Sequence, residues 1–62
     1  MENVILKNGA AQIDRKGDIV IAKTERDFVT WGIDPEGNCY WGHYFGDDFK
    51  AAAEDFTIRC DK

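Results

Sequence analysis

The stretch FVTWGIDPEGNCYWGHY, residues 28–44, decides the fold. At its centre, residues 34–38, Pro35 suits the first corner of a turn and Gly37 suits a position that requires a positive φ. These features predict a three-residue hairpin loop with a bulge. We therefore expect antiparallel strands over residues 28–34 and 38–45. In the predicted register Ile33 faces Cys39, Trp31 faces Trp41, Val29 faces His43 and Phe28 faces Tyr44.

Two further turns lie on the N-terminal side of this hairpin. The pair Asn8-Gly9 is typical of a two-residue type I′ turn, and residues 14–18 repeat the layout of residues 34–38. They predict strands over residues 3–7, 10–14 and 18–23, with a polar link between the two groups of strands. The predicted pairs are Leu6–Ala11, Val4–Ile13, Ile13–Ile19 and Ala11–Ile21.

A helix is predicted over residues 47–60. Asp47 is a plausible N-cap, and residues 51–53 are alanines, which favour a helix. Apolar residues recur at helical spacing at Phe49, Ala52, Ala53, Phe56 and Cys60. The predicted fold is therefore a single α+β domain over residues 1–62, an antiparallel β-meander of about five strands with one C-terminal α-helix packed on one sheet face.

Because side chains alternate between the faces of a sheet, the predicted registers sort the strand residues into two sets. The predicted core face, which we expect the helix to cover, holds Val4, Leu6, Ala11, Ile13, Ile19, Ile21, Val29, Trp31, Ile33, Cys39, Trp41 and Phe45. The predicted open face holds Ile5, Gln12, Val20, Ala22, Phe28, Thr30, Gly32, Tyr40, Gly42 and Tyr44. Glycines inside predicted strands, such as Gly32 and Gly42, indicate a bulge, a bend or the close approach of another group.

Composition excludes several classes of function. The chain has 62 residues, eight basic and twelve acidic side chains and a net charge of -4. This charge disfavours a nucleic-acid partner, and no apolar run approaches the roughly 20 residues of a membrane helix. The start Met1-Glu2-Asn3 lacks the basic residues and apolar core of a signal peptide, so we expect a cytoplasmic protein with reduced thiols.

Groups that could carry chemistry are few. The chain has one histidine, His43, and no serine. In the predicted register His43 points to the core face near Val29, and the separation of Cys39 from Cys60 matches no zinc or redox motif. We therefore expect no catalytic residue, no metal site, no cofactor and no small-molecule substrate, and interpret the chain as a non-enzymatic protein.

The feature most suggestive of function is the predicted open face, because a solvated sheet face is usually polar. Aromatic residues beside glycines form shallow pockets and are common in interface hot spots. The chain is thus interpreted as an interaction module that binds a protein partner or a second copy of itself. The predicted partner-binding residues are Phe28, Thr30, Tyr40 and Tyr44. Alternatively, these aromatics only stabilise a thin sheet.

A second hypothesis follows from the uneven charge. Residues 1–33 carry five acids and five bases, whereas residues 34–62 carry seven acids and three bases. The acidic half could occupy the basic groove of a partner, as an inhibitor or a nucleic-acid mimic does. The predicted acidic face consists of Asp34, Glu36, Asp47, Asp48, Glu54 and Asp55. Such binding would weaken steeply with salt.

Overall fold

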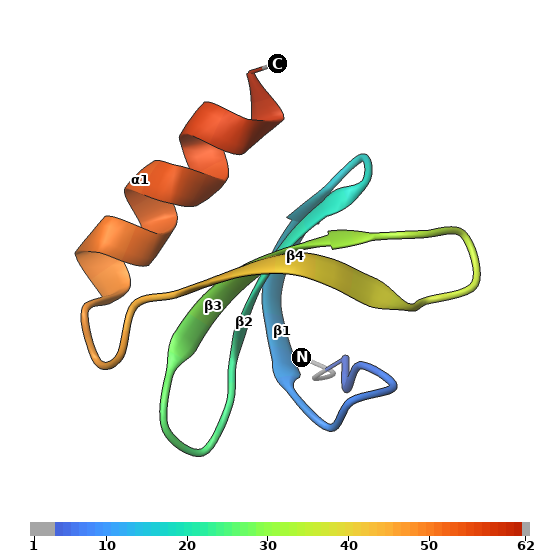
Figure 1. The fold of residues 1–62 in the computed structure, drawn as a ribbon, viewed down its shortest axis with the longest axis horizontal. Coiled ribbons are helices and arrows are strands. Elements are labelled where there is room, and N and C mark those ends of the chain that lie inside the picture. The colour runs from blue at the N-terminus through green and yellow to red at the C-terminus, as the bar shows by residue number, and fades with distance from the viewer. Residues whose placement is uncertain (1–3, 62) are drawn as a thin grey trace.

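The computed structural model describes residues 4–61. Within them, four antiparallel strands form one sheet in the order β1-β2-β3-β4, and one helix, α1, follows. Figure 1 shows α1 on one side of the sheet and the N-terminal segment on the other. The predicted class, an α+β antiparallel meander with a C-terminal helix, is confirmed. The elements are β1 (Ala11–Lys16), β2 (Ile19–Lys23), β3 (Phe28–Ile33), β4 (Cys39–Tyr44) and α1 (Phe49–Cys60).

The first turn differs from the predicted one. Gly9 donates its backbone N–H to the carbonyl of Leu6 at 2.9 Å and has a φ of 91°. Asn8 does not have the positive φ that a type I′ turn requires at both positions, so the loop has three residues. Ile5 rather than Leu6 therefore faces Ala11, in an isolated bridge. The predicted strand 3–7 is reduced to this bridge, and residue 3 lies outside the described residues.

The second turn is shorter than predicted. Lys16 pairs with Ile19 across a two-residue loop whose first residue, Gly17, has a φ of 60°. Glycine at this first position is typical of a type II′ turn. β1 therefore continues to Lys16, and a register shift leaves Ile13 without a partner between Gln12 and Asp14. The predicted pairs Val4–Ile13, Ile13–Ile19 and Ala11–Ile21 are wrong.

The link between β2 and β3 sets which side chains share a face. It is a four-residue loop between the paired residues Lys23 and Phe28. Thr24 closes it, because its hydroxyl accepts the backbone N–H of Asp27 at 2.9 Å. Counting back from this loop places Val20 opposite Trp31 and Ile21 opposite Thr30. Ile19 and Ile21 therefore lie on the opposite face from Trp31, which contradicts the predicted core face.

The third turn is as predicted. Gly37 has a φ of 89° and donates its N–H to the carbonyl of Asp34 at 2.9 Å. The predicted pair Ile33–Cys39 is confirmed, and Gly32 pairs with Tyr40. Beyond Tyr40 the register shifts by one residue, so that Thr30 faces His43 and Val29 faces Tyr44. The predicted pairs Trp31–Trp41, Val29–His43 and Phe28–Tyr44 are wrong for this reason.

The sheet is covered on both faces. On the face that we call the N-terminal side, Leu6 and Ala10 pack on the central strands and complete the apolar core. On the face that we call the helix side, α1 contacts β2 and β3, and Ile21 and Thr30 are buried. The helix therefore covers the face of β3 that was predicted to be open, but the face of β2 that was predicted to lie in the core. The apolar core consists of Leu6, Ala10, Val20, Ala22, Val29, Trp31 and Ile33, with Cys39 packed against it.

Some residues predicted for the core are instead solvent-accessible. Val4, Ile13 and Trp41 are exposed. Val4 lies in the N-terminal segment before the first turn, Ile13 lies in the β1 bulge and Trp41 lies in the β4 register shift. For Ile13 and Trp41 the misassignment follows from a one-residue error in register, which moves a strand side chain to the other face. Val4 precedes the strands, and its neighbour Ile5 is exposed as well.

The helix begins two residues later than predicted. Asp48, rather than Asp47, is the N-cap, and its carboxylate accepts the backbone N–H of Ala51 at 3.0 Å. Ala52 is buried against the sheet, and the Phe49 ring meets that of Phe28 edge-on at 5.1 Å between centroids. Within residues 4–61, no helix has the length and apolar character needed to cross a membrane.

Gly42 occupies a position with no room for a side chain. A Cβ there would lie 2.6 Å from Nε1 of the buried Trp31 indole, whereas a Cβ at Gly32 would lie 2.4 Å from the ring of Tyr40, which is partly exposed. We expect Gly42→Ala to lower the free energy of unfolding by about 2–3 kcal/mol, because Trp31 cannot move away. Gly32→Ala should cost less, because Tyr40 can swing into solvent. Urea unfolding followed by circular dichroism measures both; equal costs, or a reversed order, would contradict this account.

Candidate functional site

The four predicted partner-binding residues do not share one open face. Thr30 is fully buried beneath α1, and Phe28 packs against Phe49 of that helix. Tyr40 lies on the helix side, paired with Gly32, whereas Tyr44 lies on the N-terminal side, paired with Val29. Thr30 is therefore inaccessible to a partner, and the two tyrosines face opposite ways from the same strand.

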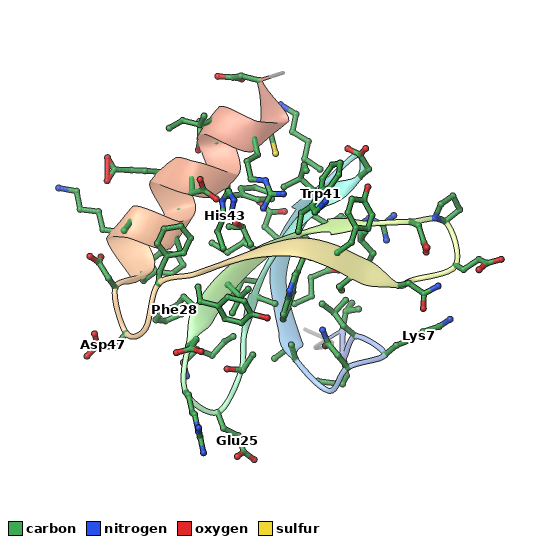
Figure 2. All side chains as sticks on the ribbon, viewed as in Figure 1. Lys7, Glu25, Phe28, Trp41, His43 and Asp47 are labelled. Atoms are coloured by element: carbon green, nitrogen blue, oxygen red, sulfur yellow. The ribbon has the colours of Figure 1, made fainter. Side chains whose placement is uncertain are left out.

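The most exposed aromatic side chain in the described part of the chain is Trp41, with 78% of its surface accessible. It lies in the register shift of β4 and has a φ of 52°, in the left-handed region. That conformation costs a residue other than glycine about 1–2 kcal/mol. The Trp31 indole fills the space beside the next residue, Gly42. Trp41 rises on the helix side of β4, as does His43 (Figure 2).

One neighbouring aromatic ring, that of Tyr40, packs against Trp41. The Tyr40 ring lies edge-on to that of Trp41, at 5.2 Å between centroids. Tyr44, 63% exposed, packs edge-on against the buried Trp31 ring on the N-terminal side at 6.2 Å. We call Tyr40, Trp41 and Tyr44 the β4 aromatic surface. It straddles a strand at the end of the sheet order, and in residues 4–61 no further strand pairs with its outer edge.

Beside this surface, a network of polar side chains joins α1 to the sheet. The hydroxyl of Thr30 donates to Oδ2 of Asp55 at 2.6 Å, and Nδ1 of His43 lies 3.0 Å from the same oxygen. Nη1 of Arg59 donates to the carbonyl and hydroxyl oxygens of Thr30, at 3.2 and 3.1 Å. The buried Thr30 of β3 is thereby joined directly to Asp55 and Arg59 of α1. Asp55 in turn joins α1 to His43 of β4.

The chemistry of the Asp55 carboxylate determines the proton positions in this network. An ionised carboxylate only accepts hydrogen bonds, so Nδ1 of His43 must carry the proton and Nε2 is left for solvent or a ligand. Burial acts to raise the pKa of Asp55. The hydrogen bonds from Thr30 and His43, together with the charges of His43 and Arg59, outweigh that effect and hold the pKa below its ordinary value. The ionised form therefore stabilises the docked helix.

The network resembles part of a catalytic apparatus, but its hydrogen bonds are arranged for structure. The Thr30 hydroxyl donates to Asp55, not to His43, so His43 does not act on it as a base. Cys39 lies on the N-terminal side, and burial raises the pKa of its thiol, with the charge of Asp34 adding to the effect. Within the residues that the structure describes, no group of three or more histidine, cysteine, aspartate or glutamate side chains is placed to hold a metal ion.

The predicted acidic residues are dispersed, and several serve internal roles. Asp34 accepts the backbone N–H groups of Glu36 and Asn38 within its own loop, and the Asn38 N–H contributes most to lowering the pKa of Asp34. Asp48 caps α1 and Asp55 belongs to the polar network. The exposed carboxylates that remain from the predicted acidic face are Glu36, Asp47 and Glu54.

Sequence reasoning missed the exposure of Trp41 and the pairing of His43 with Asp55. Both depend on the one-residue shift in β4, which moves His43 from opposite Val29 to opposite Thr30. The available signal was Gly42 inside a predicted strand, because an internal glycine indicates a bulge. A glycine inside a strand can indicate a bulge, but it does not indicate on which side of the sheet the Trp41 indole lies.

Comparison of the chain with models of protein families, with curated proteins and with solved structures finds no match.

The Asp55 carboxylate should make stability depend on pH. Its pKa is lowered in the folded state, so its contribution is complete above the ordinary aspartate pKa, about 3.9, and is lost as pH falls through the lower folded value. We expect Asp55→Asn to reduce the free energy of unfolding at pH 7 by about 1–3 kcal/mol, because charge-assisted hydrogen bonds are lost. The difference from wild type should shrink as pH falls below about 4.

Glu54→Gln is the matched control, because Glu54 is the preceding residue of α1 and is exposed. Urea unfolding of the two variants and the wild type across this pH range gives the comparison. Equal stabilities of Asp55→Asn and Glu54→Gln at pH 7, or a difference between Asp55→Asn and wild type that does not change with pH, would refute a role for the ionised carboxylate.

Proposed function

We propose that this chain is a small, non-enzymatic interaction module that binds another protein through the β4 aromatic surface. The observation that carries the proposal is the exposed Trp41, held in a left-handed conformation that a large side chain rarely adopts. Backbone strain of this kind is often found at functional sites. Tryptophan and tyrosine are also the residues most enriched in interface hot spots.

The same geometry indicates how a partner would bind. β4 lies at the end of the sheet order, where an added strand could pair with it. The register shift at Trp41 interrupts the regular row of hydrogen-bonding groups that such pairing uses, and bulges protect sheet edges in this way. Contact through the aromatic side chains is therefore favoured over strand addition. Tyr40 and Tyr44 would extend the contact to either side of Trp41.

A protein other than a second copy is the favoured occupant. The chain has a net charge of -4, so two copies repel one another. The proposal includes a cytoplasmic location, where Cys39 and Cys60, both free thiols, would remain reduced. A protein acting instead through its acidic residues would bind in a manner that depends steeply on salt and not on Trp41.

Trp41→Gly tests the proposal because it separates binding from stability. Relief of the left-handed strain, about 1–2 kcal/mol, offsets the loss of the Tyr40 contact and the added entropy of the unfolded chain. We expect the free energy of unfolding to stay within about 1 kcal/mol of wild type, by urea denaturation. Co-purification of the tagged full-length chain from its native cells should retain a protein partner with wild type, and about tenfold less or none with Trp41→Gly.

Ile58→Ser provides the control, because Ile58 is a similarly exposed apolar residue, at 58%, on α1. This variant should retain the partner as wild type does. Sedimentation of the purified chain should show a monomer at micromolar concentration. The proposal fails if Trp41→Gly and wild type retain the same proteins, or if the purified chain is a dimer that Trp41→Gly dissociates, which would make a second copy the occupant.

A further inference from the structure

The charge around the β4 aromatic surface indicates the chemistry of its partner. We infer that the partner presents a basic segment, with a lysine or arginine side chain placed on the Trp41 indole. This inference rests on the proposed function and adds to it the class of side chain that is recognised. It combines two separate observations, the exposed indole and the position of carboxylates at the ends of the strand that carries it.

The indole itself favours a cation. Trp41 is 78% exposed, and the face of a tryptophan ring attracts ammonium and guanidinium groups more strongly than other aromatic rings do. Tyr40 meets Trp41 edge-on at an interplanar angle of 79°, so the two rings form a corner rather than a continuous flat surface. A long aliphatic stem that ends in a charge can lie along one ring while its charged group rests on the other.

Carboxylates lie at both ends of β4. The loop before the strand carries Asp34 and Glu36, and the loop after it carries Asp47 and Asp48. Figure 1 shows these loops at opposite ends of the strand. The strand has six residues and spans about 20 Å, so an extended basic peptide of similar length could contact the aromatic rings and both acidic ends.

Cations of the chain itself reduce this negative charge only in part. The Lys7 stem lies against the loop at Gly37, and its charge contributes to the lowered pKa of Asp34. Lys50 follows Asp48 in the first turn of α1. Arg15 also acts on Cys39 at the start of β4, and Lys23 lies over Phe28, whose N–H donates to Gly46 in the loop after β4. Glu36 and Asp47 are the exposed carboxylates that take no part in the loop and cap hydrogen bonds of Asp34 and Asp48, and they remain to attract a basic partner. Arg59 and His43 lie between the two ends but are engaged with Thr30 and Asp55.

The test uses two capped peptides of the length of β4, added to the full-length chain. One alternates glycine with arginine, and the other carries citrulline, a neutral isostere, in place of each arginine. Nuclear magnetic resonance of the indole N–H groups reports binding at Trp41, and the buried Trp31 is the internal reference. We expect the arginine peptide to shift the Trp41 signal saturably, and the citrulline peptide to bind about tenfold more weakly.

Three variants show whether the site is specific. Trp41→Gly should weaken binding of the arginine peptide, measured by calorimetry, by about five- to tenfold. The double variant Glu36→Gln/Asp47→Asn should weaken it several-fold and reduce its salt dependence. Asp14→Asn/Glu54→Gln removes the same charge from exposed residues of β1 and α1 and should leave binding nearly unchanged.

Several results would overturn the inference. These are no binding of the arginine peptide, equal binding of the citrulline peptide, an undiminished affinity in Trp41→Gly, or equal losses in the two double variants, which would indicate attraction by net charge alone. If the citrulline peptide binds equally well at Trp41, the aromatic surface stands and only the preference for a basic partner is lost. If native-cell partners are retained by Trp41→Gly, the proposed function itself is lost.

Discussion

The extra residue that β4 inserts at Trp41 and Gly42 decides which side chains meet on the helix side of the sheet. In a regular ladder the residue facing Thr30 would be Gly42. With the inserted residue it is His43, which therefore reaches Asp55 of α1. The Trp31 indole occupies the space beside Gly42 and leaves no room there for a side chain. The same insertion turns Trp41 outward, so helix docking and indole exposure have a common origin.

The two layers that cover the sheet are held in different ways. On the N-terminal side, Leu6 and Ala10 complete an apolar core that includes Trp31. On the helix side, Ala52 is buried but a fully buried threonine, linked to Asp55 and Arg59, supplies the specific contacts. Buried polar groups are costly unless they are hydrogen-bonded, and every buried side-chain nitrogen and oxygen in the described residues has a partner. The network therefore fixes where α1 lies, while the opposite face supplies most of the apolar burial.

The separation of the apolar core and the polar network from the exposed aromatic side chains is compatible with the proposed interaction module. The β4 aromatic surface borders the polar network, and its three aromatic side chains are distinct from the side chains of Thr30, His43, Asp55 and Arg59 that fix α1. Trp41 and Tyr44 can therefore contact a partner without disturbing the apolar core or the helix contacts. In the proposed interaction, the acidic loops at the ends of β4 would direct an approaching basic partner, since electrostatic complementarity acts mainly on encounter and specificity. The position of the aromatic rings on a rigid strand limits the entropy lost on binding.

The sequence by itself determined the α+β meander, the C-terminal helix and the 34–38 turn. These depend on local properties: the φ that Gly37 and Pro35 accept, the alternation of apolar residues and the helix propensity of residues 51–53. It also indicated a bulge, a bend or a close approach at Gly32 and Gly42, without distinguishing between the two. Only the tertiary structure decided the registers and the faces, because a loop one residue longer or shorter moves every side chain of a strand to the opposite side. The extra residue in β4, which no local pattern fixes, placed Trp41 in solvent and His43 beside Asp55.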